Sequence, residues 1–186
     1  MKVDYATVAY WYGAPGATSG LPPVPNAAER ALPRLTTPPV FVAEQALEGE
    51  ELAVAACSGG HHEVQDLGLF ESTFSRDRHR FWRGGKVGDE LVLTVPVAAA
   101  GRYRVVAAFV MADDFAQVAL TLGGTTLGAP FDGYSPTIRS SGVRVLGELA
   151  LPAGPTELRL RLVGSHAAAK PGLAVGLDYL LLEPLR

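Results

Sequence analysis

The sequence has little cysteine, methionine and tryptophan, and it has no long apolar run. Its 186 residues include one cysteine, two methionines and two tryptophans. A lone Cys57 cannot form an internal disulfide, so cysteine usage gives no information about the redox compartment. No apolar run is long enough to span a bilayer, and the N-terminus lacks the apolar core of a signal peptide. The sequence therefore leaves the localisation open.

Charge is also sparse and nearly balanced. Charged residues make up 19% of the chain and give a formal net charge of -3, which provides no electrostatic basis for binding nucleic acid or acidic membranes. One basic segment, RDRHRFWRGGK, places arginines around Phe81 and Trp82, a combination found in nucleic-acid and sugar sites. Because no nucleic-acid motif accompanies it, we expect neither a nucleic-acid nor a membrane partner.

Sequence signatures of catalysis are missing. The chain has no G-x-S-x-G nucleophile elbow, no Walker loop, no H-E-x-x-H motif and no pair of cysteines. A glycosidase needs two carboxylates at a defined separation, and no Asp or Glu pair stands out for that role. We therefore assign no catalytic residue and expect that the chain is not catalytic alone.

The regular pattern that is present is typical of β-strands. Glu90–Val97 and Arg102–Val110 alternate, and the second run places Tyr103, Val105, Ala107 and Phe109 on one face. Gly123-Gly124 between two short runs is a hairpin signal, and further alternating runs end at Gly and Pro turns. With no convincing long helix, residues 40–186 are predicted to form an antiparallel β-sandwich of the jelly-roll type.

The N-terminal residues 1–39 do not continue the pattern of regularly spaced strands. A strand-like run, Asp4–Tyr12, leads into a connector rich in proline and glycine, Gly13–Pro39. A single strand has no partner, and leaving its backbone unpaired is unfavourable. We therefore expect this strand to pair outside the sandwich, with a partner interface made of Tyr5, Val8, Tyr10 and Trp11.

Aromatic residues beside aspartates are the candidates for sugar contacts. A carbohydrate site combines an aromatic face for the sugar ring with carboxylates for its hydroxyl groups. That pattern nominates Trp82, Asp114, Phe115 and Tyr134. The alternative is structural: the aspartates cap turns and Trp82 packs at an edge of the core.

Three consecutive residues, His61, His62 and Glu63, suggest a metal site at first sight. Metal-binding histidines on a helix are typically four residues apart, and adjacent side chains on a strand point to opposite faces. Both considerations favour an ordinary solvated loop.

Several segments together resemble the C-terminal region of glycoside hydrolase family 172, which includes enzymes acting on difructose anhydrides and arabinofuranosides. They are GDELVLTVPVAAAGRYRVVAAFV, LTLGGTTLGAPFDGYS, LGELALPAGPTELRLRLVG and GLDYLLLEP, preceded by SGGHHEVQDL and FWRGGK. The opening strand and connector resemble the segment that leaves the family's catalytic jelly rolls. The resemblance implies that 1–39 is the terminal strand of a preceding jelly roll plus a connector, and that 40–186 is an accessory sandwich.

The sandwich is also similar to carbohydrate-binding modules of families 6 and 35. Those modules begin with a Glu-x-Glu strand, end with an Asp-Tyr strand, and ligate a structural calcium between the two ends. The resemblance maps Glu44 and Asp178 onto these ligands, while Val42 stands where the first Glu would be and removes one hard oxygen ligand. Calcium is thus left open, and no cofactor is required. Gly176 stands near the place where these modules offer an Asn for sugar recognition.

The resemblance implies a non-catalytic accessory subunit or tail that assembles with family-172-like catalytic jelly rolls. The alternative is a carbohydrate-binding module for fructan- or arabinan-type glycans, and an independent glycosidase is a third hypothesis. The implied partners are a catalytic domain or subunit, further copies of this chain, and a glycan ligand.

Overall fold

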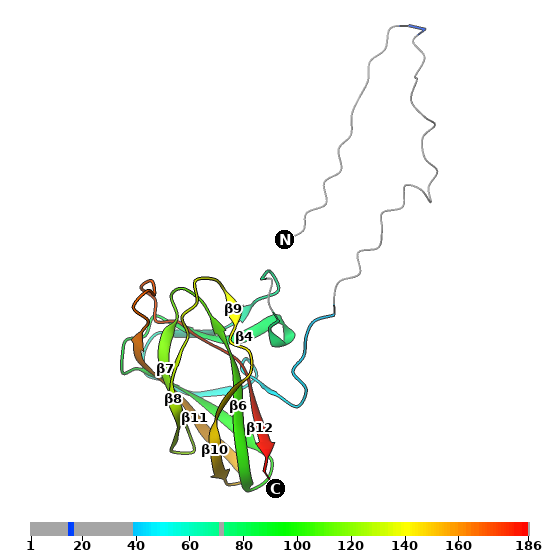
Figure 1. The fold of residues 1–186 in the computed structure, drawn as a ribbon. Coiled ribbons are helices and arrows are strands. Elements are labelled where there is room, and N and C mark those ends of the chain that lie inside the picture. Colours follow the sequence, from blue (N-terminus) through cyan, green and yellow to red (C-terminus); the bar gives the residue numbers. More distant parts are fainter. Residues whose placement is uncertain (1–14, 17–38, 71–72, 186) are drawn as a thin grey trace. The chain divides into compact units, whose positions relative to one another are not determined.

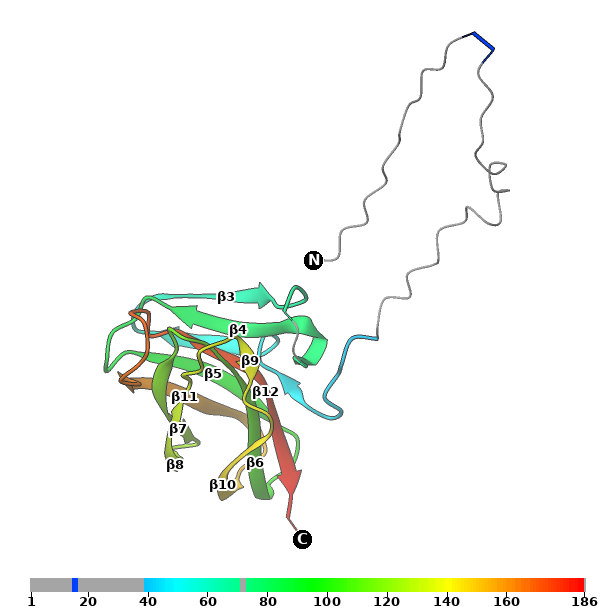
Figure 2. The ribbon, with the colours of Figure 1, turned by 45° about the horizontal axis from the view of Figure 1, so that its top comes forward.

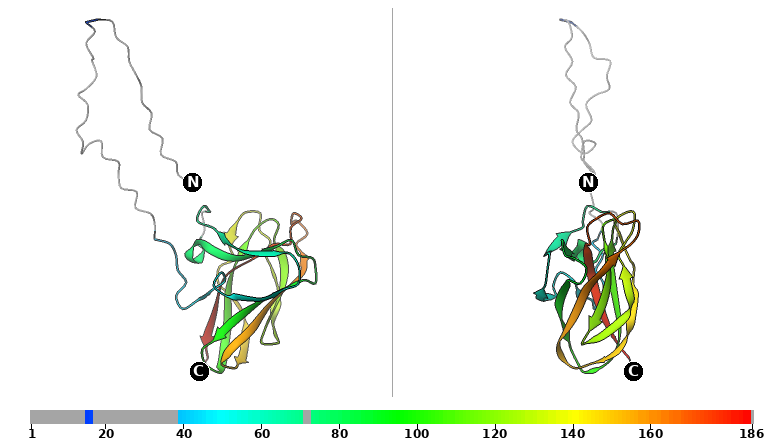
Figure 3. Two further views of the ribbon diagram at one scale, coloured as in Figure 1. Left: turned by 180° about the vertical axis from the view of Figure 1, so that it is seen from behind. Right: turned by 90° about the vertical axis from the view of Figure 1, so that its left-hand side faces the viewer.

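Two antiparallel β-sheets enclose a shared apolar core (Figures 1 and 3). The computed structural model describes residues 15–16, 39–70 and 73–185. The first sheet runs in the order β10 (Arg144–Leu151), β6 (Gly101–Met111), β12 (Val175–Pro184), β4 (Arg78–Arg83) and β3 (His61–Asp66), with short β1 (Leu47–Glu48) on β12 and β9 (Arg139–Ser140) on β6. The second sheet runs in the order β2 (Ala53–Cys57), β5 (Glu90–Val97), β11 (Gly154–Ser165), β7 (Ala116–Leu122) and β8 (Thr125–Asp132).

This arrangement confirms the antiparallel β-sandwich that the sequence predicts. Among the described residues the only helical element is a short 3-10 turn, η1 (Ser75–Asp77), and none of these residues forms a helix long and apolar enough to cross a membrane. Val40–Arg186 forms a compact unit by itself. The predicted interface residues Tyr5, Val8, Tyr10 and Trp11 lie outside the described residues, so the assignment of residues 1–39 stays a prediction.

Strict alternation in the sequence builds the core. Leu158, Leu160 and Leu162 of β11 are buried, while the residues between them point outward. The face predicted for β6, with Tyr103, Val105, Ala107 and Phe109, lies in the same core cluster. Burial of each such side chain contributes about 1.5–3 kcal/mol relative to an exposed one.

The turn at Gly123-Gly124 is confirmed as a hairpin between β7 and β8. Leu122 pairs with Thr125, and the two glycines have φ of 56° and 82°. Positive φ at both central residues matches the right-handed twist of the flanking strands, and glycine adopts it without steric strain.

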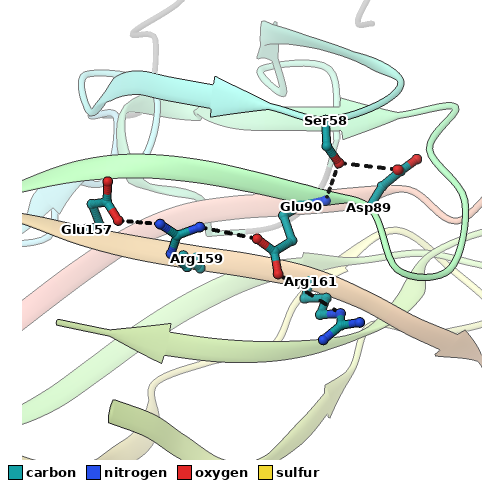
Figure 4. A network of polar contacts seen from close by, with 6 residues as sticks. All are labelled: Ser58, Asp89, Glu90, Glu157, Arg159 and Arg161. Atoms are coloured by element: carbon teal, nitrogen blue, oxygen red, sulfur yellow. Dashed lines mark hydrogen bonds and ion pairs between the residues drawn. The ribbon is translucent and has the colours of Figure 1, made fainter. Parts of the chain in front are cut away.

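The outer face of the second sheet carries an ion-pair network (Figure 4). Arg159 of β11 contacts Glu157 at 2.5 Å and Glu90 of β5 at 3.3 Å, and Arg161 approaches Glu90 at 4.0 Å. Beside them Ser58 donates to Asp89 and accepts from the backbone of Glu90. These partly exposed contacts fix the register of two central strands and contribute little net stability each.

Part of the outer face of the first sheet, over β6 and β12, is covered by other segments of the chain. Phe74 and Leu67, from the chain between β3 and β4, pack on Val110, Ala112 and Phe115. Ala43 and Ala46 pack on Ala108 and Tyr179 of the same face. We call these two segments the cover. Leu67 lines a cavity, and Ala43 donates its N–H to Ser75 in an acidic cluster.

Candidate functional site

A cavity of about 200 Å³ lies between the cover and the ends of β3, β4 and β6 (Figure 2 shows β3 and β4 side by side). Three aromatic rings stand in its wall, those of Phe70, Phe81 and Phe115, and the Phe81 and Phe115 rings are 6.0 Å apart. Phe70 is 38% exposed and Phe115 is 6% exposed. The other lining residues are Gln65, Leu67, Val110, Ala112, Asp113, Asp114 and Ile138.

A buried histidine supports one wall of this cavity. Gln65 of β3 and His79 of β4 are cross-strand partners, and His79 Nε2 lies 2.7 Å from Gln65 Oε1. His79 is fully buried, and this burial lowers its pKa to about 4, so the ring is neutral at pH 7. The carbonyl oxygen of Gln65 can only accept, so His79 Nε2 carries the proton of this hydrogen bond.

Two aspartates line the other side. Asp113 binds Lys170 at 2.5 Å, and its carboxylate raises the pKa of that exposed lysine. No hydrogen bond from the described residues reaches the Asp114 carboxylate. The cavity thus combines aromatic faces, an amide and carboxylates, which is a chemistry suited to polyhydroxylated ligands.

Of the four predicted sugar contacts, the structure brings Asp114 and Phe115 together in this cavity. Tyr134 does not line it; its half-buried ring stacks on His166 with centroids 4.3 Å apart. Trp82 is only 1% exposed and donates its indole N–H to the Gly59 carbonyl at 2.8 Å. A ring enclosed in the core cannot stack on a sugar, which corrects the assignment of Trp82 as a sugar contact.

The sequence reasoning also missed Gln65, Phe70 and Phe81, which join the cavity through strand pairing. The segment His61–Asp66 is a strand, not the loop we expected. Its sequence shows no apolar alternation, since Val64 is its only apolar residue and is exposed, so only the pairing with β4 places Gln65 opposite His79.

A second polar environment is a buried acidic cluster. Ser75 joins its two main members, because its backbone N–H donates to Asp178 Oδ1 at 3.0 Å and its hydroxyl donates to Glu48 Oε1 at 2.8 Å. The other carboxylate oxygens, Glu48 Oε2, Glu50 Oε2 and Asp178 Oδ2, are buried without a hydrogen-bond partner. Arg76 Nε lies 3.4 Å from Glu48 and supplies positive charge.

Burial dominates the electrostatics of this cluster. It raises the pKa of Asp178 to about 7, and the carboxylates of Glu48 and Glu50 add to this effect. It also raises the pKa of Glu48 and Glu50, partly offset at Glu48 by the hydrogen bond from Ser75. Asp178 is the extra residue where the register shifts between Leu177 and Tyr179, and such a bulge redirects one side chain.

The predicted metal pair of Glu44 and Asp178 stays a prediction, and the structure adds Glu48 as a neighbour of Asp178. Glu44 is exposed, whereas Glu48 shares Ser75 with Asp178. The signal was present in the sequence, since Glu48-Gly49-Glu50 is itself a Glu-x-Glu run. Within residues 39–70 and 73–185, no three Asp, Glu, His or Cys side chains are close enough to hold a metal ion by themselves. The donors present are hard oxygens with unpaired lone pairs, which suit calcium once water or main-chain oxygens complete the shell.

The sandwich is similar to a segment of a Paenibacillus xanthan lyase. The two share 18% sequence identity at a TM-score of 0.67, over 81% of this chain and 14% of that one. At this identity the likeness concerns the fold. This chain spans only a small part of the xanthan lyase.

Lower similarity links the chain to two isolated modules. One is the CBM36-1 domain of a multidomain xylanase from the hindgut metagenome of Trinervitermes trinervoides (16% identity, TM-score 0.49, 76% of this chain and 97% of that one). The other is a family 35 carbohydrate-binding module from Clostridium thermocellum (20% identity, TM-score 0.47, 76% and 99%). No protein-family model and no curated protein matches the sequence.

Proposed function

We propose that the protein is a glycan-binding accessory module and that the cavity beneath Phe70 and Phe81 is its binding site. The observation that carries this proposal is the combination of three aromatic rings, one amide and two aspartates in one cavity. Its volume of about 200 Å³ is below the ~300–1,000 Å³ typical of sites for drug-sized ligands, so it suits a single sugar ring. The fold shared with part of a polysaccharide lyase supports the same interpretation.

The direct test is binding of the full chain to soluble fructan, arabinan, mannan, xylan and xanthan, by affinity electrophoresis and calorimetry. Phe81→Ala removes a ring face of the cavity and is expected to weaken binding about tenfold, or about 1.4 kcal/mol. Phe41→Ala is the matched control, because Phe41 is 42% exposed and does not line the cavity. Unchanged binding in Phe81→Ala, with the protein still folded, would place the site elsewhere.

We also propose that the acidic cluster binds calcium as a structural ion. Glu48 and Asp178 would hold it together with water or main-chain oxygens, and its charge would offset the repulsion between the two carboxylates. With 5 mM calcium in place of a chelator, the midpoint of thermal unfolding should rise by about 5 °C or more. Glu48→Gln should abolish the rise, and Glu44→Gln should retain it. The assignment would be refuted if calcium left the midpoint of thermal unfolding unchanged, or if both variants lost the increase in midpoint equally.

Assembly with a family-172-like catalytic jelly roll is the second function that we propose, through Tyr5, Val8, Tyr10 and Trp11. What supports it is that Val40–Arg186 is a compact unit by itself. Deleting residues 1–39 should therefore leave the cooperative unfolding transition in place and abolish co-purification with such a catalytic subunit. Loss of the folded sandwich on deletion would show instead that the opening strand belongs to it.

A further inference from the structure

The donor groups of the cavity are arranged in a fixed way. Because the Gln65 carbonyl accepts from His79, the Gln65 amide N–H groups are directed away from His79 and remain free for a ligand. The His79 ring cannot easily leave this position. It packs 5.4 Å from the Phe81 ring, and its Nδ1 lies so close to Gly176 that a Cβ there would approach it to 2.4 Å. Gln65 is thus a positioned donor rather than a freely rotating one.

The charge of the cavity has one sign. Among the described residues that line it, Asp113 and Asp114 are the only ionisable ones, and no Lys, Arg or His stands in the wall. Lys170, which forms an ion pair with Asp113, is 73% exposed. An anionic group entering the cavity would therefore meet the unpaired Asp114 carboxylate and no free positive charge, while a hydroxyl group would find both acceptors and the Gln65 donor.

We propose that the cavity binds the end of a neutral glycan and discriminates against uronic acids, and that Gln65, positioned by His79, is the specificity-determining donor. This inference rests on the proposed glycan-binding function and adds the class of sugar. A neutral sugar ring offers an aliphatic face to Phe81 and Phe115 and hydroxyl groups that both donate and accept. A uronate replaces one of these hydroxyl-bearing carbons with a carboxylate, which carries only acceptors and a negative charge.

Probe pairs that differ only in the carboxylate test the proposal. The full chain is titrated with galactose and galacturonate, and with glucose and glucuronate, by NMR chemical-shift perturbation. Galactan and polygalacturonate are compared by affinity electrophoresis. We expect the neutral member of a pair to bind at least tenfold more tightly than its uronate, with shifts at Gln65 and Phe81. Equal or tighter binding of the uronate would overturn the inference and leave the glycan-binding function standing. Binding of neither member of any pair would overturn both.

Two variants separate the donor from the charge. Gln65→Glu keeps the acceptor for His79 and replaces the donor with a carboxylate. A neutral sugar is not repelled by the added charge, so the expected loss of at least tenfold in neutral-sugar affinity reports the missing donor. Asp114→Asn should bring the uronate and neutral affinities closer together. Gln117→Glu on the second sheet is the matched control and should change neither. His79→Phe should reproduce the loss seen in Gln65→Glu. Neutral-sugar affinity unchanged in a folded Gln65→Glu variant would overturn the role of Gln65.

Discussion

Replacing Gly49 with alanine is expected to destabilise the sandwich by about 3 kcal/mol. Gly49 lies between Glu48 and Glu50 and donates its N–H to the Asp178 carbonyl at 2.7 Å. A Cβ at this position would lie 2.2 Å from the Leu177 carbonyl oxygen and 2.9 Å from that of Asp178. Both atoms belong to the backbone of a central strand, so no side chain can rotate to make room. Denaturant-induced unfolding measures the effect.

The control for this substitution is Gly101→Ala at the start of β6. There a Cβ would meet only the Tyr103 side chain, at 3.7 Å, which is an ordinary contact. Gly101→Ala should stay within about 0.5 kcal/mol of the wild type. Similar free energies of unfolding for the two variants would show that β1 yields without strain, and would remove the steric argument.

The second large effect is expected when the pH is lowered, because the buried His79 makes the free energy of unfolding depend on pH. Its pKa of about 4 in the folded protein lies below the ordinary 6.5 because burial disfavours the charged ring. Between these two values the unfolded chain binds a proton that the folded chain does not, so stability falls as the pH falls. From pH 6.5 to pH 4 the His79 contribution amounts to about 3 kcal/mol.

Because the raised pKa of Asp178 and Glu48 acts with the opposite sign, the quantity to measure is a difference. The free energy of unfolding of the wild type, minus that of His79→Phe, should decline as the pH is lowered through this window. The same difference taken with Phe41→Ala, at an exposed side chain that does not titrate, should stay flat. A flat His79 difference would mean that the folded protein accommodates the charged ring.

The strands of the sandwich were predictable, and the contents of the site only in part. Glu90–Val97 and Arg102–Val110 are recognisable as strands, and Tyr103, Val105, Ala107 and Phe109 are buried as their alternation indicates. The residues between Val105 and Phe109 are buried as well, because other segments cover the outer face of β6, and the alternation does not indicate that. The burial of Trp82 depends on the strands that flank β4. These are β3 and β12, and β12 is far from β4 in the sequence. Asp114 and Phe115 were found because they are adjacent in the sequence. Gln65 and His79 were missed because their contact exists only across a strand pair.

The acidic cluster also depends on contacts between segments that are distant in the sequence. Two Glu-containing segments lie near the start of residues 40–186, and in the structure Glu48 is buried and bonded to Ser75 whereas Glu44 is exposed. That contact depends on η1, where Arg76 and Asp77 adopt φ of 52° and 54°. Such left-handed conformations are uncommon for residues other than glycine, and the local sequence does not predict them.

The position of β12 determines when this protein can fold during synthesis. β12 is the last strand along the chain, yet it lies between β6 and β4 in the first sheet and also holds β1 (Figure 1). The ribosome must therefore release residues Val175–Pro184 before that sheet can close. Until then β6 and β4 present open edges to other nascent chains. Because its central pairings join segments that are distant in the sequence, the domain is expected to fold slowly for its size and to be most prone to aggregation until β12 has left the ribosome.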